Sequence, residues 1–360
     1  MDFAKFPHLK GDIFGGITAG IVALPLALAF GVQSGMGAEA GLYGAIGLGI
    51  FAALFGGTNT QISGPTGPIT VVSASMIALI ISHKGSFEAA LPTVLFCFFL
   101  AGGFMVLVGT LRIGQYIKDI PYPVVSGFMT GIGVIIIILQ FFPMLGYESP
   151  KTIPDILSNL NEPLGNIHWP SLALTILTMT IVYVFPKISK SVPSTLIALV
   201  VVTLITEFIS IEVKIIGNIP SGLPEFHFDL FTVISDFKIV LMPAITLAAL
   251  GAIDSLLTSV VADNVTRTSH NSNKELIGQG IGNMVSGFIG GIPGAGATMR
   301  TLVNINSGGT TKLSGTIHGV FLLLVLLGIS ALASRIPLPV LSGILLTVGI
   351  NIVDRRGLSH

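Results

Sequence analysis

The sequence predicts an all-α polytopic membrane protein, on the evidence of its composition and its repeated apolar segments. The chain of 360 residues is 51% hydrophobic and 9% charged, whereas soluble domains carry about 25% charged residues. Apolar runs of about 20 residues, the length that crosses a bilayer as a helix, recur along the chain. Because lipid cannot satisfy backbone polar groups, these runs predict helices rather than a barrel.

Twelve segments are apolar enough to predict helices that enter the membrane. Pro25 interrupts the first and Pro243 the eighth, and the tenth is shorter than a full span. The single cysteine, Cys97, lies within the fourth, so no intramolecular disulfide can form. The segments cover residues 13–33, 38–57, 67–82, 90–111, 121–142, 170–186, 192–209, 238–262, 275–290, 297–306, 314–333 and 338–353.

The basic residues predict the orientation of these segments. If the N-terminus is cytoplasmic, most Lys and Arg residues fall in cytoplasmic connections, as the positive-inside rule requires. We therefore expect a multi-pass protein of the plasma membrane (the bacterial inner membrane) with a cytoplasmic N-terminus. The basic residues placed inside are Lys5, Lys10, Arg112, Lys118, Lys187, Lys190, Arg267, Lys274, Lys312, Arg355 and Arg356. Those placed outside are Lys84, Lys151, Lys214, Lys238 and Arg335, and Arg300 is left within the membrane.

Two stretches rich in Gly and Pro interrupt the helical pattern at corresponding places. Residues 63–70 open the third segment and residues 292–300 open the tenth. Non-helical backbone at membrane depth is tolerated only where protein encloses it. The two segments are seven apart, and a seven-helix repeat passed twice gives an inverted topology in which two half-helices point their N-termini at one midplane point. Free N–H groups and helix dipoles at that point predict an anion site.

A carboxylate within the eighth segment predicts a cation site beside this anion site. Asp254 interrupts an apolar run, and an ionisable group at that depth costs roughly 2.5–3.5 kcal/mol unless a partner, an ion or water compensates. Thr258 follows four residues later and therefore lies on the same helical face. A carboxylate beside a hydroxyl suits a hard cation such as Na⁺, or a proton that titrates.

Several of these features also have structural interpretations. Glycine-rich stretches often only allow close helix packing. Asp254 could form an ion pair with Arg300, the other charge within the membrane. Arg300 could face either the anion or the lipid headgroups. His318, in the eleventh segment, is interpreted as a hydrogen-bonded packing residue rather than as a proton relay.

The motifs of the chain resemble those of the SulP family of anion transporters, also called the solute carrier 26 group. The stretch 11–20 resembles the opening of the family's first helix, and 262–270 with 273–283 carries the most specific match. Within the family, the stretches 291–299 and 303–309 are most similar to the branch of sodium-dependent bicarbonate transporters. The resemblance covers essentially the whole chain.

The resemblance implies a seven-plus-seven inverted repeat that is divided into a core domain and a gate domain, with elevator-like movement of the core. The core domain would comprise residues 11–115 and 236–334, and the gate domain residues 116–235 and 335–360. Sodium coordination would fall on Asp254, Thr258, Gly296 and Thr298. The anion would bind at the half-helix N-termini, at Thr66, Gly67, Ala297, Thr298 and Arg300.

The chain departs from the family's patterns at several places. Pro25 is followed by Leu26, where many sulfate-transporting relatives have a Pro-Gln pair. The acidic residue of the eighth segment is Asp254, where many proton-coupled relatives have a glutamate. Arg300 matches the sulfate-type members, and a fixed positive charge could favour a divalent anion. Family members normally continue through two more helices and a cytoplasmic STAS domain, so the gate domain is expected to be incomplete at His360.

The sequence therefore predicts a secondary active anion transporter that couples Na⁺ to bicarbonate, with no cofactor besides this coupling ion. A proton-coupled sulfate or dicarboxylate symporter and an uncoupled anion exchanger or channel remain open as alternatives. An enzyme is not expected, because the sequence contains no HExxH pair and no suitable Ser/His arrangement. The expected partners are the lipid bilayer and the transported ions. A homodimer is compatible with the family, and no nucleic acid is expected.

Overall fold

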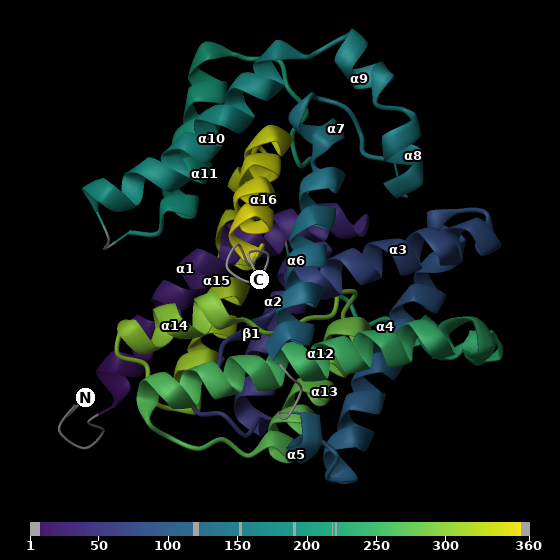
Figure 1. Cartoon of the computed structure of the whole chain (residues 1–360), viewed down its shortest axis with the longest axis vertical. Coiled ribbons are helices and arrows are strands. Elements are labelled where there is room, and N and C mark those ends of the chain that lie inside the picture. The colour runs from purple at the N-terminus through teal and green to yellow at the C-terminus, as the bar shows by residue number, and fades with distance from the viewer. Residues whose placement is uncertain are drawn as a thin grey trace.

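A computed structural model of the chain describes residues 8–117, 122–150, 153–189, 192–217, 219 and 222–353. Each of the twelve predicted segments contains most of one of the longer helices of the structure (Figure 1). These helices are α1 (Leu9–Ser34), α2 (Ala38–Phe55), α3 (Gly67–Lys84), α4 (Phe87–Thr110), α6 (Tyr122–Leu139), α10 (Trp169–Ile188), α11 (Ser194–Ile209), α12 (Phe237–Thr266), α13 (Ser272–Phe288), α14 (Thr298–Asn306), α15 (Lys312–Ala333) and α16 (Leu338–Ile352).

Short elements connect these helices. Four of them are α5 (Gly114–Ile117), α7 (Phe141–Met144), α8 (Ile153–Ser158) and α9 (Asn161–Gly165). Two 3₁₀ turns, η2 (Phe228–Phe231) and η3 (Ile234–Asp236), precede α12. The end of the predicted gate part, 354–360, lies outside the described residues, as do the basic residues Lys5, Lys118, Lys151, Lys190, Arg355 and Arg356.

The helix ends differ from the predicted boundaries where polar residues extend an apolar helix. α1 begins at Leu9 and α12 continues to Thr266, each about one turn beyond the predicted apolar segment. Hydropathy marks the part of a helix that lipid surrounds, whereas backbone hydrogen bonding continues into the polar turn beyond it. α12 ends where Arg267 adopts a left-handed conformation with φ 56°.

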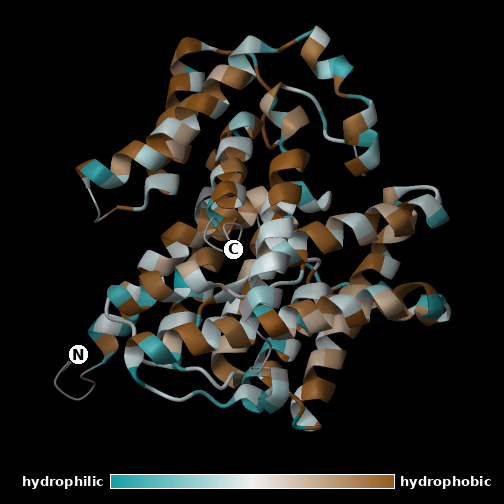
Figure 2. Ribbon diagram, viewed as in Figure 1, coloured by the Kyte–Doolittle hydropathy of each residue, from teal (hydrophilic) through white to brown (hydrophobic). Residues whose placement is uncertain are grey.

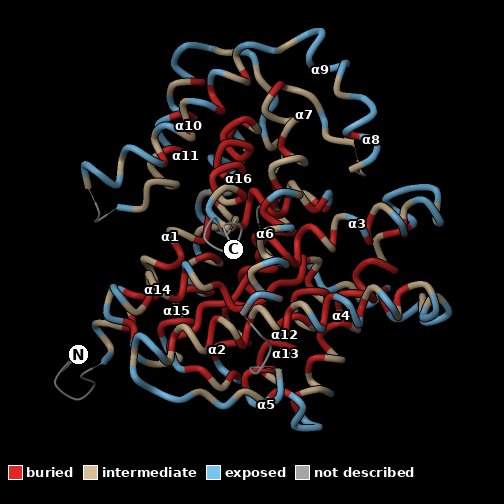
Figure 3. Tube along the Cα trace, in the orientation of Figure 1, coloured by how far each residue is buried: buried red, intermediate tan, exposed pale blue. Residues whose placement is uncertain are grey.

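Length and composition support membrane insertion of this helical assembly. Within the described part of the chain, six helices are long and apolar enough to cross a membrane. They are Leu9–Ser34, Ala38–Phe55, Gly67–Lys84, Phe87–Thr110, Trp169–Ile188 and Ile234–Thr266. Large apolar side chains on the outer helices, such as Trp169, Ile188 and Phe208, are strongly exposed. Figure 2 shows how apolar residues are distributed along the helices, and Figure 3 shows the buried centre.

The helices pack in two groups. In the first, α13 packs on α4 and α2, α15 packs on α1 and α2, and α12 packs on α4. In the second, α16 packs on α10, α6 and α11 (Figure 1). Contacts of α1 with α16 and of α3 with α6 join the groups. The division into a core domain and a gate domain, and their relative movement, stay predictions.

Small residues allow the helices of the first group to approach with their backbones in contact. A Cβ placed on Gly102 of α4 would lie 2.5 Å from the carbonyl oxygen of Gly280, and one placed on Gly280 would lie 2.5 Å from that of Gly102. Side chains at these positions would therefore force α4 and α13 apart. Close packing of this kind substitutes for hydrophobic association, which is weak between helices in lipid.

Candidate functional site

The two stretches rich in Gly and Pro meet in the interior of the protein. β1 (Ser63–Gly64) and β2 (Ala295–Gly296) pair antiparallel, with Ser63 opposite Gly296 and Gly64 opposite Ala295. A Cβ placed on Gly294 would lie 2.1 Å from the carbonyl oxygen of Gly64, so the two backbones are in direct contact. Each strand leads into a helix, and α3 and α14 therefore start close together (Figure 1).

Extended residues precede both helices and leave their first turns open. Thr66 and Ala297 are the N-cap residues of α3 and α14, and neither caps its helix with its side chain. The first N–H groups of a helix have no partner within the helix. Two such ends produce a local positive field and a set of donors suited to an anion.

The N–H group of Ala297 is not one of the free donors. It donates to the carbonyl oxygen of Ile62 at 2.8 Å, which joins the two extended segments. The expectation that the backbone of Ala297 binds the anion is therefore corrected for its N–H group. Ala297 contributes to the wall, and the donors on this side belong to the first turn of α14, which begins at Thr298.

Asp254 of α12 lies at the start of α3. Thr66 Oγ1 donates a hydrogen bond to Asp254 Oδ2 at 2.9 Å. This bond connects the predicted cation-binding carboxylate to a predicted anion-binding residue. Asp254 is only partly buried, whereas its neighbours Ser255 and Thr258 on α12 are fully buried. The carboxylate is therefore placed at the edge of the packed interior, where an ion can reach it.

The remaining predicted cation ligands gather one helical turn further along α12. Thr258 Oγ1 donates to the carbonyl oxygen of Gly296 at 3.0 Å and lies 2.8 Å from Thr298 Oγ1. With Asp254, these groups form a set of carboxylate, hydroxyl and carbonyl oxygens, which suits a hard cation. The structure therefore brings Thr258, Gly296 and Thr298 together, and Asp254 precedes Thr258 by one helical turn on α12. Their joint binding of sodium stays a prediction.

Additional residues, which the sequence analysis did not identify, hold the Gly296 peptide in place. Ser255 Oγ accepts a hydrogen bond from the Gly296 N–H at 3.1 Å, whereas Thr258 bonds to the Gly296 carbonyl. A Cβ placed on Gly296 would lie 2.2 Å from Gln61 Nε2. Gln61 thus packs directly against the Cα of Gly296. Ser255 is adjacent to Asp254 in sequence, but no local signal pointed to Gln61.

Gln61 is itself fixed by a buried carboxylate. Glu275 of α13 accepts hydrogen bonds from Gln61 Nε2 at 2.9 Å and Gln279 Nε2 at 2.8 Å. It also accepts hydrogen bonds from the backbone N–H groups of Gly57 and Thr58, both at 2.8 Å. These four donors satisfy the charge, which is the condition for burying a carboxylate. Glu275 therefore supports the site rather than offering oxygens to an ion.

Arg300 points toward the protein interior and not toward the lipid headgroups. Its side chain is buried, and Nη2 donates to the carbonyl oxygen of Pro65 at 2.6 Å. Nη1 has no hydrogen-bond partner among the described atoms. A Cβ placed on Gly64 would lie 2.6 Å from this Nη1. The guanidinium therefore lies against the turn that precedes α3, where it adds positive charge to the two helix ends.

Two structural interpretations of the sequence are wrong in detail. No ion pair within 4.0 Å joins Asp254 to Arg300 among the ion pairs of the described residues. His318 of α15 is buried, but neither ring nitrogen has a hydrogen-bond partner among the described atoms. Its ring instead packs on α2, where a Cβ placed on Gly49 would lie 2.8 Å from Nδ1.

The start of α3 is covered by the second group of helices. A Cβ placed on Gly67 would lie 2.9 Å from Ile136 of α6 and 3.4 Å from Ile352 of α16. Gly67 is thus the predicted anion-site residue at which the two helix groups approach each other. The side chains that the second group presents there, Ile136 and Ile352, are apolar.

Comparisons with known proteins agree with this arrangement. The chain is 49% identical over 355 residues to the bicarbonate transporter BicA of Picosynechococcus sp., which covers 97% of this chain and 62% of that relative. It is 36% identical to the putative sulfate transporter YvdB of Bacillus subtilis, over 97% of this chain and 66% of that relative. The chain thus spans about three fifths of the length of the BicA relatives that it matches.

Solved structures show the same fold. The transmembrane domain of a cyanobacterial bicarbonate transporter BicA matches with a TM-score of 0.92 and 48% identity, over 97% of this chain and 90% of that one. Murine Solute Carrier 26 family member A9 matches with a TM-score of 0.85 at 19% identity, over 98% of this chain and 62% of that one, and so supports the fold alone. The model of the sulfate permease family matches residues 9–360. With the helical fold and the paired helix ends, this match shows that the chain belongs to the sulfate permease family, a family of membrane transporters rather than enzymes.

Proposed function

We propose that this chain is the ion-carrying membrane part of a secondary active transporter that couples Na⁺ to bicarbonate. The observation that carries the proposal is the set of oxygens from Asp254, Thr258, Gly296 and Thr298 beside the starts of α3 and α14. One cation and one anion fit this arrangement side by side. Relatives at 48–49% identity that are named bicarbonate transporters support bicarbonate as the anion.

The membrane potential explains why the anion needs a co-ion. Moving one negative charge into a cell costs about 2.3 kcal/mol per 100 mV of inside-negative potential. Sodium that binds with the anion makes the transported pair neutral. Without Na⁺, the carboxylate of Asp254 repels an anion held at Thr66. With Na⁺ bound, this repulsion is removed, so each ion strengthens the binding of the other.

The hydroxyl groups of the site would reorient when a cation binds. Thr258 and Thr298 have hydroxyl groups that donate to neighbouring oxygens in this structure. Rotation about their Cβ–Oγ bonds would turn oxygen lone pairs toward a cation at Asp254 without moving the backbone. The Gly296 N–H is held by Ser255 and Gln61 packs against the Gly296 Cα, so the backbone that carries this carbonyl is already fixed.

For translocation we propose an elevator-type movement of the first helix group against the second. The closeness of Gly67 to Ile136 and Ile352 supports this mechanism, because Gly67 is a predicted anion-site residue and these neighbours belong to the second group. A cytoplasmic N-terminus in the plasma membrane and a homodimeric assembly belong to the same proposal.

A second function is favoured by Arg300. Its buried guanidinium near the start of α3 could hold the second charge of sulfate or of a dicarboxylate, with a proton on Asp254 in place of Na⁺. Similarity to a putative sulfate transporter of Bacillus subtilis supports this alternative.

Uptake of labelled bicarbonate into proteoliposomes separates the two functions. We expect uptake that requires an inward Na⁺ gradient and continues in the presence of excess sulfate. Uptake that follows a proton gradient and is blocked by sulfate or a dicarboxylate would replace sodium–bicarbonate symport with the alternative. Uptake that needs neither gradient would identify an exchanger or channel.

A further inference from the structure

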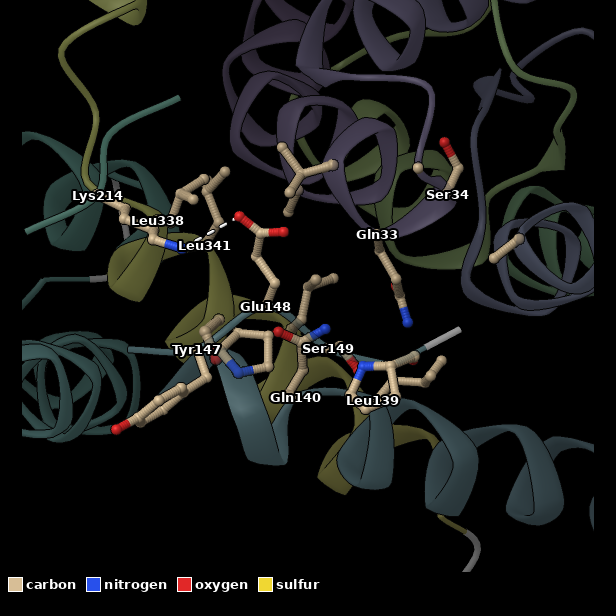
Figure 4. A pocket seen from close by; sticks show the side chains of 18 of the residues that line it. Gln33, Ser34, Leu139, Gln140, Tyr147, Glu148, Ser149, Lys214, Leu338 and Leu341 are labelled. Carbon is tan, nitrogen blue, oxygen red and sulfur yellow. Dashed lines mark hydrogen bonds and ion pairs between the residues drawn. The ribbon is translucent and has the colours of Figure 1, made fainter. Parts of the chain in front are cut away.

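A cavity of about 470 Å³ lies between the two helix groups, away from the ion site. The ends of α1 and α3 form one wall, and α6, α7, α10 and α16 form the other (Figure 4). Asp254, Thr258, Gly296 and Thr298 do not line it. The cavity lies at the C-terminal end of α1, which is the outer end of this helix in the proposed orientation.

Polar side chains without partners line this cavity. Both amide atoms of Gln33 are shielded from solvent and have no hydrogen-bond partner among the described atoms. Ser342 Oγ is likewise unpartnered, and its residue is 1% exposed. Gln140 also lines the cavity and is buried. Figure 4 shows Gln140 beside the apolar side chain of Leu139. Buried polar groups are normally hydrogen-bonded, so the unpartnered Gln33 and Ser342 indicate a ligand site.

The chemistry of these groups favours a small ligand that both donates and accepts hydrogen bonds. A Gln amide has an NH₂ donor and a carbonyl acceptor, and a Ser hydroxyl can act as either. The two charges at the cavity, Glu148 and Lys214, pair with each other at 3.1 Å. Bicarbonate has one O–H donor and acceptor oxygens, and therefore matches Gln33 on both sides. Sulfate has only acceptors and would place an oxygen against Gln33 Oε1.

Helix α3 connects this cavity to the ion site. Ala74, Ile77 and Ile81 line the cavity, and Thr70 lies on the same helical face because it is four and seven residues before the first two. Thr70 and Ser73 are fully buried, and neither hydroxyl has a hydrogen-bond partner among the described atoms. Along α3 they come between the start of the helix and the residues that line the cavity, so unpartnered hydroxyl groups occur on this helix between the two sites.

We propose that this cavity is an entrance site that binds bicarbonate before it reaches the ion site and selects it over sulfate by its hydroxyl group. The proposal rests on bicarbonate being the transported anion. The selection takes place at uncharged groups, Gln33, Gln140 and Ser342, and is therefore separate from the charge balance at Asp254 and Arg300.

Protection of an introduced cysteine tests occupancy of the cavity directly. In a Cys97→Ala background, which removes the single native thiol, the partly exposed cavity residue Ser149 is replaced by Ser149→Cys and labelled with a membrane-impermeant thiosulfonate reagent. We expect bicarbonate to slow labelling several-fold and sulfate at the same concentration to leave the rate unchanged. Equal protection by both anions, or no protection in a variant that still transports bicarbonate, would overturn the proposal. If Ser149→Cys does not fold, Tyr147→Cys places the thiol in the same cavity.

Transport kinetics supply a second readout. Gln33→Met removes both amide atoms at similar volume and should raise the KM for bicarbonate from the cavity side about tenfold, as expected for the loss of one or two hydrogen bonds. The half-saturating Na⁺ concentration should not change. Ser75→Ala, which removes an exposed hydroxyl of α3 that bonds to the Val71 carbonyl outside the cavity, is the matched control. An unchanged KM in Gln33→Met would contradict the entrance site.

The two proposals fail in different ways. A wild-type protein that shows no bicarbonate transport would defeat the proposed function, whatever the labelling results. Sodium-dependent bicarbonate transport without anion protection or a change in KM would leave that function intact and remove only the entrance site.

Discussion

Two carboxylates on neighbouring helices, Asp254 on α12 and Glu275 on α13, differ in the number of hydrogen bonds that they accept. Asp254 accepts one, from Thr66, among the hydrogen bonds of the described residues, and it is only partly buried. Glu275 accepts four and is 1% exposed. A carboxylate offers about four lone-pair sites. Asp254 therefore retains capacity for an ion, whereas Glu275 has used its capacity to hold the structure.

The difference separates a binding carboxylate from a supporting one on geometric grounds. Both residues lie in segments that resemble the family, so sequence similarity alone does not distinguish them. The two regions are nevertheless connected, because Glu275 holds Gln61 and Gln61 packs against Gly296. Variants of Asp254 and variants of Glu275 should therefore have different effects on sodium binding and on stability.

The largest effect on transport is expected from Asp254→Asn. Removing the charge should reduce sodium-dependent uptake to a few per cent or less, because losing one partner of a buried charge interaction costs about 2–5 kcal/mol. The fold should persist, since only the bond from Thr66 depends on this group. Uptake in proteoliposomes and thermal unfolding in detergent measure the two properties. Full retention of coupled transport would show that Asp254 does not bind the cation.

Glu275→Gln should reduce the stability of the protein more than it reduces sodium-dependent transport. The amide presents a donor to groups that already donate, so we expect a loss of about 2–4 kcal/mol in stability. Thermal unfolding of the purified protein measures this change. For the fraction that folds, the half-saturating Na⁺ concentration should change less than in Asp254→Asn. A variant of normal stability that has lost sodium dependence would show that Glu275, and not only Asp254, binds the ion.

Gly296→Ala tests the connection between the two regions. The new methyl group would lie 2.2 Å from Gln61 Nε2, so either Gln61 or the Gly296 carbonyl must move. Overpacking of this kind costs about 1–3 kcal/mol, which corresponds to about five- to a hundredfold weaker sodium binding if the carbonyl moves. Shortening the neighbour with Gln61→Asn in the same protein should restore part of the affinity. Unaltered sodium dependence in the single variant would exclude the Gly296 carbonyl as a ligand.

The smallest effect is expected from Thr258→Ala. This change removes one hydroxyl oxygen and should raise the half-saturating Na⁺ concentration about five- to tenfold, as expected for about 1 kcal/mol or slightly more. Thr258→Ser keeps the oxygen and is the matched control. Bicarbonate uptake measured over a range of Na⁺ concentrations gives the result. Equal sodium dependence of the two variants would count against Thr258 as a ligand.

The sequence by itself determined the helices and the two breaks between them, and it singled out Asp254 as a candidate ion-site residue. Apolar length, Gly and Pro are local properties, and each acts within one or two turns of the chain. Asp254 was identifiable because a carboxylate in an apolar helix is costly, which makes it a candidate for function. The assignment of Gly296 and Thr298 came from family resemblance, and both lie with Thr258 in the structure.

Only the tertiary structure decided how these residues interact. It showed that the Ala297 N–H is used by Ile62, that Arg300 bonds to Pro65 and not to Asp254, and that His318 has no hydrogen-bond partner in the described part of the chain. The support of Gly296 by Gln61 and Glu275 was likewise not visible in the sequence. These contacts join segments that are far apart along the chain, and their geometry depends on how closely the intervening helices pack.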